Sequence, residues 1–404
     1  MKCPHCATDL KRAERTGRVC AHCERRFALD PREDGKGMHD LRIRRCAERA
    51  TDAGRLTVTL TQLWYLSRTH DFARPAVARR GVPPGLRWLA ALPAAAALVV
   101  CAIVVEAVPA YVPLAAAVAA LVAAAVMRHR PARAADSGIE PFEETFRRLM
   151  TGHWTRAYGS LPEGVVDDRR ETPSPGSSPG ATTSPGTTSR GAAARVSGPR
   201  AVILCTDPAV SVFLETNGIP ARLRAVLVDV PGRTGPARYA AALSPAQVTR
   251  EALRGLDRFR AGLPVVVLHD AGVQGALLAP LLRAARPDRV VVDAGLPASA
   301  VRRSRRAVRL LMSAPPVGAE ELRTVAGLSE ADAAWLAEGF WSPLAAVPPP
   351  LLESVTVRAV EHALTAPAPV PGTGDARNHG FLTWPADAHA PGTGTSRTEG
   401  TSTA

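Results

Sequence analysis

The sequence predicts a multi-domain α/β membrane protein. Three observations predict it: two Cys-x-x-Cys pairs within the first 23 residues, a forty-residue apolar stretch with one charged residue, and a C-terminal alternation of Val/Leu runs with helical segments. They indicate an N-terminal metal module, a two-helix transmembrane hairpin, and a three-layer α/β domain with a mainly parallel sheet. A chain of 404 residues is long enough for two or three such units.

Composition narrows the class of partner and the compartment. The net charge of +13 favours an anionic partner, either nucleic acid or an acidic membrane face. The chain has seven cysteines, of which three are scattered singly, so a disulfide framework is not expected and the thiols are predicted to be reduced. The first 40 residues are polar and basic, so we expect no signal peptide and a cytosolic N-terminus.

The two cysteine pairs predict a zinc site. Cys3 and Cys6 form one turn, Cys20 and Cys23 form the other, and thirteen residues separate them. Zinc prefers four tetrahedral ligands, and each C-x2-C turn supplies two thiolates on one side of the ion. Because four thiolates leave no coordination position open, the predicted role of the metal is structural. A redox dithiol pair and unliganded cysteines are the alternatives.

The segments "KCPHCATD" and "VCAHCERRF" resemble the zinc-ribbon class over residues 1–30. The resemblance implies a small metal-stabilised module, which we place at residues 1–36. The class often has glycine just after each pair, where the turn favours positive φ, but Ala7 and Glu24 stand there in this chain. His5 and His22 lie inside the pairs and are alternative ligands.

Residues 86–127 predict a transmembrane hairpin with spans at 88–105 and 110–127. Each span has 18 residues, about 27 Å of helix. The residues predicted to separate the spans are Glu106, Pro109 and Pro113. Arginines flank the pair on both sides and none lies between the spans, so the positive-inside rule predicts an inner (cytoplasmic) membrane location with both termini cytoplasmic. A buried helical hairpin is the alternative.

The segments around the hairpin and after it are of simpler character. Residues 37–85 contain a basic helical segment, for which a solvated face, anionic lipid headgroups and nucleic acid are the alternatives. Residues 128–168 look amphipathic and juxtamembrane, through Phe142, Phe146, Leu149 and Met150. Residues 169–198 and 365–404 are rich in Pro, Ser, Thr and Gly, which predicts a disordered linker and tail.

Residues 199–364 predict the cytosolic α/β domain, and its strand ends predict where a ligand would bind. In parallel sheets ligands bind beyond the carboxyl ends of the strands. Polar residues stand at those ends in this chain: Thr206, Asp207, Asp229, His269, Asp270 and Asp293. If the domain is an enzyme, the predicted catalytic residues are Asp229, His269, Asp270 and Asp293, with Mg²⁺ as the ion for phosphoryl chemistry. The alternative is that these aspartates are caps and loop residues.

The segment "VVVLHDAGVQGALL" resembles the metal-binding strand and turn of Toprim-type domains. The resemblance covers about 100 residues and implies metal held on acidic strand ends. Of the acidic pair in the Toprim pattern only Asp270 remains, and Thr206 or Asp207 holds the place of its glutamate. This implies a degenerate, non-catalytic relative.

Two further features, Cys205 and the arginine-rich segment 301–309, each have a functional and a structural interpretation. Cys205 beside His269 is a candidate nucleophile and base, with a buried inert thiol as the alternative. The segment "VRRSRRAVR" at 301–309 is either a solvated helix face or an anion-binding patch.

The sequence therefore predicts a membrane-anchored cytosolic interaction or regulatory protein with a structural zinc ribbon and a non-catalytic α/β domain. The alternative is a metal-dependent phosphoryl-transfer or nucleic-acid-processing enzyme of Toprim-like type. A third hypothesis is a nucleic-acid binder that uses the ribbon and the arginine-rich segments. The predicted partners are the lipid bilayer, a protein, and anionic lipid or nucleic acid.

Overall fold

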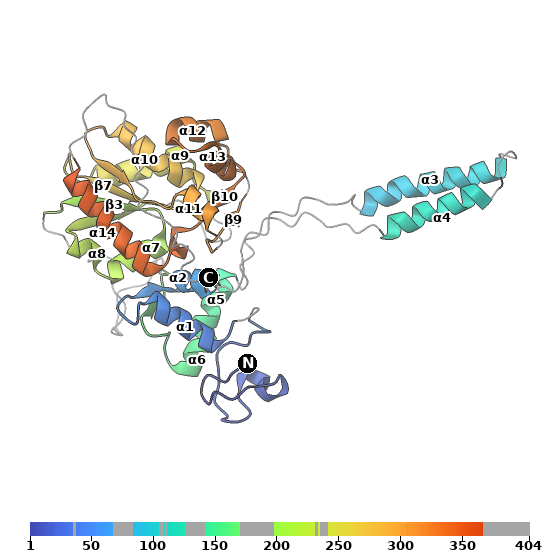
Figure 1. Cartoon of the computed structure of the whole chain (residues 1–404), viewed down its shortest axis with the longest axis horizontal. Helices are drawn as coiled ribbons and strands as arrows, with labels where there is room; N and C mark the ends of the chain where they lie inside the picture. The colour runs from blue at the N-terminus through green and yellow to red at the C-terminus, as the bar shows by residue number, and fades with distance from the viewer. Residues whose placement is uncertain are drawn as a thin grey trace, which may run out of the picture. The chain divides into compact units, whose positions relative to one another are not determined.

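The computed structural model of the chain is shown in Figure 1. It forms two compact units, one of Met1–Asp71 with Ile139–Ala404 and one of Phe72–Gly138. The residues that the structure describes are 1–34, 38–67, 84–104, 109, 111–126, 142–169, 198–230, 233–234, 241–304, 306–312 and 314–366. Most of the predicted linker, the predicted tail beyond residue 366, and Glu106 lie outside these residues.

The second unit holds α3 (Pro84–Val104) and α4 (Tyr111–Val126), which lie side by side. Within the described part of the chain, no helix combines the length and the apolar character that crossing a membrane requires. The predicted transmembrane hairpin and inner-membrane location are therefore wrong. Helix α4 has 16 residues, about 24 Å against a hydrocarbon core of about 30 Å. Helix α3 is longer, with Arg87 in its first turns and Pro93 inside it.

Short elements from both sides of this interval form a helical module in the first unit. Strand β1 (Val58–Thr59) pairs in parallel with β2 (Val165–Val166). The module's helices are α1 (Asp40–Ala50), α2 (Leu60–Ser67), α5 (Glu143–Arg148), the π-helix η2 (Leu149–Trp154) and α6 (Thr155–Tyr158). Phe146, Leu149 and Met150, three of the four residues in the predicted amphipathic pattern, are buried in its core.

The C-terminal part contains the predicted parallel sheet, and its α/β layering is confirmed. Four parallel strands lie in the order β4-β3-β7-β8. Their bounds are β3 Ala201–Cys205, β4 Ala225–Asp229, β7 Val265–Leu268 and β8 Val291–Asp293. All nine residues of β3 and β7 are buried, as the continuous Val/Leu runs predicted.

Helices cover both faces of this sheet (Figure 1). On one face α9 (Pro245–Leu256) and α10 (Val273–Ala285) pack on Val202, Leu204 and their neighbours. On the other, α7 (Pro208–Thr216) and α14 (Pro349–Thr365) pack on Ala201 and Ile203. This second core continues into the helical module.

Smaller elements complete the first unit. The helices are η1 Ala13–Arg18, α8 Ile219–Arg222, α11 Ala298–Arg303, α12 Ala319–Ala326, α13 Glu330–Ala337 and η3 Leu344–Ala346. Two antiparallel pairs are β5 (Arg233–Thr234) with β6 (Ala241–Ala242), and β9 (Leu310–Leu311) with β10 (Phe340–Trp341). Residues 307–312 supply only the short β9, which lies outside the main sheet.

The strand order fixes where a ligand crevice would open. The chain passes from β3 outward to β4 and then returns to β7 on the other side of β3. In open α/β sheets the crevice lies at this reversal, beyond the carboxyl ends of the two strands. Asp207 follows β3 and Asp270 follows β7, so both stand at that point.

Candidate functional site

The two cysteine pairs form two turns of the same construction. In the first, the Ala7 N–H donates to the Cys3 carbonyl at 3.1 Å; in the second, the Glu24 N–H donates to the Cys20 carbonyl at 2.8 Å. An antiparallel bridge closes each turn, Lys2 with Asp9 and Val19 with Arg26. The thirteen residues between the pairs contain η1.

The residue after each pair has left-handed backbone. The φ angle is +60° at Ala7 and +57° at Glu24. The expectation that these turns favour positive φ is therefore confirmed. Residues with a Cβ rarely adopt this backbone conformation. The turns are therefore held in it by their hydrogen bonds and by the ligand of the cysteines.

The four Sγ atoms of Cys3, Cys6, Cys20 and Cys23 lie within 4.8 Å of one another. Cys3 Sγ is 3.8 Å from Cys23 Sγ, and Cys6 Sγ is 3.8 Å from Cys20 Sγ. A tetrahedral ion bound to four thiolates at about 2.3 Å would set its ligands about 3.8 Å apart. The cluster therefore fits a structural metal ion such as zinc. His5 is not in the cluster, because its Nε2 lies 2.8 Å from the Arg26 carbonyl, and neither is the exposed His22.

The cysteines differ in their surroundings. Cys3 and Cys20 are buried beside Leu10 and Phe27, and burial raises the pKa of Cys3 to about 12. Hydrogen bonds from Thr8 lower the pKa of Cys6 to about 6. Ionising all four thiols in this small space requires a cation among them, so metal binding and thiol ionisation are coupled.

A buried carboxylate joins the cysteine module to the helical module. Asp40, in the first turn of α1, accepts the N–H groups of Ala28 and Leu29, each at 2.8 Å, and the hydroxyl of Tyr158. Asp40 is buried, with only 1% of its surface exposed. The sequence interpretation missed this contact. The one signal for it was an aspartate at the start of a helix, which also fits a simple helix cap.

At the sheet edge, the carboxylates at the strand ends accept hydrogen bonds from the chain's own backbone N–H groups. Asp207 caps α7 through the Ala209 N–H at 2.9 Å, and its second oxygen accepts the Ala345 N–H at 2.9 Å. Asp270 accepts the Leu344 N–H at 2.7 Å. Residues 344–347 are buried across the crevice between β3 and β7, so we name them the edge segment. Ser342 holds its start through two backbone hydrogen bonds to Ala271, each 2.9 Å long.

The two carboxylates influence each other. Burial and the charge of Asp270 raise the pKa of Asp207 to about 7, although its backbone donors oppose this rise. The edge segment thus lies over two neighbouring acidic groups, of which Asp207 holds its proton more tightly than an ordinary carboxyl group.

His269 and Asp293 form a buried pair at the ends of β7 and β8. The ring Nε2 lies 2.9 Å from Asp293 Oδ1, and Nδ1 lies 2.7 Å from the Asp270 carbonyl. Burial alone would lower the pKa of His269, but the charge and hydrogen bond of Asp293 raise it overall. Both partners accept, so the imidazole donates from both nitrogens and is positively charged. Neither nitrogen is left for a metal, a substrate or Cys205.

The remaining predicted site residues are placed as follows. Asp229 is exposed at the end of the outer strand β4. Thr206 is partly buried and bonds through its N–H to the Leu268 carbonyl. Cys205 is buried, and burial raises the pKa of its thiol far above its ordinary value. Among the described residues, the four cysteines are the one group of three or more His, Cys, Asp or Glu side chains placed to hold a metal ion.

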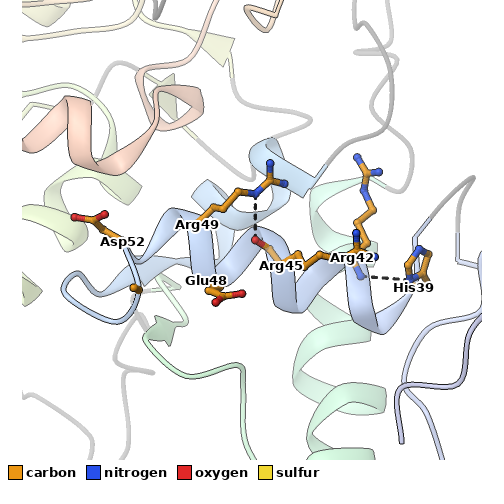
Figure 2. A pocket seen from close by; sticks show the side chains of 7 residues that line it. His39, Arg42, Arg45, Glu48, Arg49 and Asp52 are labelled. Carbon is orange, nitrogen blue, oxygen red and sulfur yellow. Dashed lines mark hydrogen bonds between the residues drawn. The ribbon is translucent and has the colours of Figure 1, made fainter. Parts of the chain in front are cut away.

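The two arginine-rich segments differ in what their guanidinium groups contact. In the 301–309 segment, Arg302 pairs with Asp332 at 2.7 Å, and Arg309 donates to the carbonyls of Val301, Arg302 and Ser304. These two guanidinium groups therefore hold the fold together. Along α1, by contrast, Figure 2 shows a pocket lined by side chains of the helix.

The pocket on α1 is mostly cationic. Arg42, Arg45 and Arg49 lie three and four residues apart and so share one side of the helix. The Nε atoms of Arg45 and Arg49 donate to carbonyls one turn earlier on the same helix, and neither guanidinium pairs with a carboxylate of the described chain. Glu48 and Asp52 also line the pocket. We call Arg42, Arg45 and Arg49 the arginine face.

Comparisons with protein-family models, with curated proteins and with solved structures find no match to this chain.

Proposed function

We propose that this protein is a non-catalytic interaction protein, in which a zinc-loaded N-terminal ribbon and the arginine face of α1 contact an anionic partner. The observation that carries this proposal is the edge segment. The crevice where an α/β domain binds its substrate is filled by residues 344–347, and the carboxylates that would hold an ion there are bonded to their backbone.

Zinc is the metal that we propose for the four-cysteine cluster. Tetrahedral sites of four thiolates select zinc or iron. Zinc is not redox-active, so a zinc site does not have to be shielded from oxidants in an exposed module. Cys3, Cys6, Cys20 and Cys23 would hold the ion. The metal would stabilise residues that bury too little surface to fold without it.

An anionic partner is favoured by charge. Residues 1–67 contain 14 Lys and Arg against 9 Asp and Glu, a net charge of +5. Arginine forks bind phosphates and carboxylates through paired N–H donors. Unlike Arg302 and Arg309, the exposed Arg45 and Arg49 hold no other element in place. Among anionic partners, nucleic acid offers the regular phosphates that a row of arginines contacts.

A manganese titration tests the non-catalytic part of the proposal. Mn²⁺ added to the full-length, zinc-loaded chain would broaden the amide NMR signals of nearby residues if it bound at the sheet edge. We expect the signals of Leu344 and Ala345 to broaden no more than those of the exposed Arg250 on α9. Selective broadening at the edge segment, abolished by Asp270→Asn, would contradict the proposal and favour a metal-dependent enzyme.

A further inference from the structure

A second cavity lies between the cysteine module and α6. Its volume is about 240 Å³. The cysteine module contributes Arg18, Arg26 and the ring of Phe27, and the helical module contributes His153 and Arg156. We call it the ribbon pocket. It is distinct from the pocket on α1, because the two share no lining residue.

The ribbon pocket carries an excess of positive charge. Arg18, Arg26 and Arg156 line it, against Glu33 as its acidic residue. Arg18 also pairs with the buried Asp34 at 2.8 Å, so three guanidinium groups against these two carboxylates leave one positive charge. Burial lowers the pKa of His153; the charges of Arg18 and Arg156 lower it further, and those of Asp34 and Glu33 oppose them.

Two of these guanidinium groups are available to a ligand. Arg18 is already engaged, since it donates to the Ala28 carbonyl at 3.0 Å and to Asp34 at 2.8 Å. Arg26 and Arg156 are exposed, and neither forms an ion pair or side-chain hydrogen bond with a described residue. The ligand donors of the pocket are therefore Arg26 from one wall and Arg156 from the other, while Arg18 is held by its ion pair with Asp34.

The helical wall has an unusual backbone. His153 lies in the π-helix η2, directly before the buried Trp154. Single π-helical turns are rare overall, and many of those that occur lie at functional sites. The wider turn changes which side chains face a cavity. Here the wider turn brings His153 to the pocket while Trp154 is packed in the core, 4.8 Å from the Tyr158 ring.

We propose that the ribbon pocket binds a phosphoryl group. A phosphoryl monoester carries about −1.5 to −2 charges, so it can pair with the guanidinium groups of both Arg26 and Arg156, whereas a carboxylate carries a single charge. Its three oxygens can accept the paired N–H groups of two arginines at once. The cavity is smaller than those that enclose drug-sized ligands, so it suits one such group and not a large ligand. The source of the phosphoryl group is either free phosphate or the terminal phosphate of a nucleic acid strand.

Calorimetry on the full-length, metal-loaded chain tests this proposal. Inorganic phosphate and two oligonucleotides of one sequence, with a 5′-phosphate or a 5′-hydroxyl, are titrated at constant ionic strength. Binding of phosphate with no preference for the 5′-phosphate strand identifies the free ion as the ligand; a preference of tenfold or more identifies the strand terminus. The variant Arg26→Ala/Arg156→Ala is expected to weaken either interaction at least tenfold, whereas the exposed Arg250→Ala on α9 leaves it unchanged.

Metal content separates loss of the pocket from loss of the fold. Both variants are expected to retain the metal stoichiometry of the parent chain. The proposal is overturned if phosphate does not bind at millimolar concentration and the two oligonucleotides bind equally, or if the double variant with full metal content binds as the parent does. In either case the manganese titration at the sheet edge still stands as a separate test of the proposed function.

Discussion

The cysteine cluster and the sheet edge contain equally suggestive residue types, but they differ in what their side chains already bind. The four cysteine sulfurs converge on one another within 4.8 Å. At the sheet edge Asp207 and Asp270 bond to the backbone of residues 344–345, and Asp293 bonds to His269. A candidate site is therefore identified less by its residue types than by whether their donors and acceptors are left for a ligand.

The largest effect that this comparison predicts is on the cysteine cluster. Removing the metal with a chelator, or the substitution Cys20→Ser, is expected to unfold the N-terminal module, because metal binding contributes on the order of 10 kcal/mol to the folding of such modules. Elemental analysis measures the loss of metal, and amide NMR spectra show which residues unfold. Signals of the parallel sheet are expected to persist.

The substitution Cys101→Ser is the control, since Cys101 is exposed on α3 and lies outside the cluster. It is expected to retain one metal ion per chain. A Cys20→Ser chain that keeps its full metal content would show that the cluster is not the metal site.

A substitution against the His269 ring should give the largest effect at the sheet edge. A Cβ added at Gly295 would lie 2.2 Å from the ring atoms Cδ2 and Nε2 of His269. Gly295→Ala must therefore displace a charged ring from its buried partners, which we expect to cost about 3 kcal/mol or more of unfolding free energy. Urea unfolding followed by tryptophan fluorescence measures it.

Gly152→Ala is the matched control, because nothing lies within 4 Å of a Cβ at that helical position. It should be neutral, or slightly stabilising through helix propensity. If both alanine variants unfold at the same urea concentration, the His269 ring is not held between β7 and β8 as described.

A smaller effect is expected in the pH dependence of stability. The pKa of Asp207 rises to about 7 on folding, so between about pH 4 and pH 7 the folded chain binds more protons than the unfolded chain. Stability contributed by this group is present at low pH and is lost as the pH rises through this window, with a slope approaching 1 kcal/mol per pH unit. Urea midpoints measured from pH 4.5 to 6.5 give the slope.

Asp207→Asn is expected to flatten this slope, and the exposed Asp288→Asn serves as the control. A parent chain whose stability rises through this window, or an unchanged slope in Asp207→Asn, would contradict the placement of a buried carboxyl under the edge segment.

The outcomes of the sequence predictions follow the range of the interactions concerned. The cysteine turns were predictable, because the two cysteines of each pair are only three positions apart in the sequence. The sheet was predictable, because the continuous run Val265–Leu268 is typical of a strand buried on both faces. The edge segment was not, since Asp207 and Ala345 are 138 residues apart and their bond leaves no mark in either local sequence.

The membrane prediction failed for a different reason. The interval did form two packed helices, α3 and α4. Counting uncharged residues, however, treats alanine like leucine, and eight of the 16 residues of α4 are alanine. Helix α4 ends after 16 residues, so a count of uncharged residues along the sequence overestimated the length of helix that forms.

The smallest predicted effect concerns the strain that the cysteine turns tolerate. Ala7 and Glu24 adopt φ angles near +60°, which cost a residue with a Cβ about 1 kcal/mol relative to glycine. Glycine also loses more entropy on folding, so Ala7→Gly should stabilise the metal-bound module by only about 0.5 kcal/mol and tighten metal binding about twofold. Competition with a chromophoric chelator measures this change. Ala21→Gly, in the second turn but without positive φ, should give no gain; an equal gain there would mean that the left-handed backbone is not what limits the affinity.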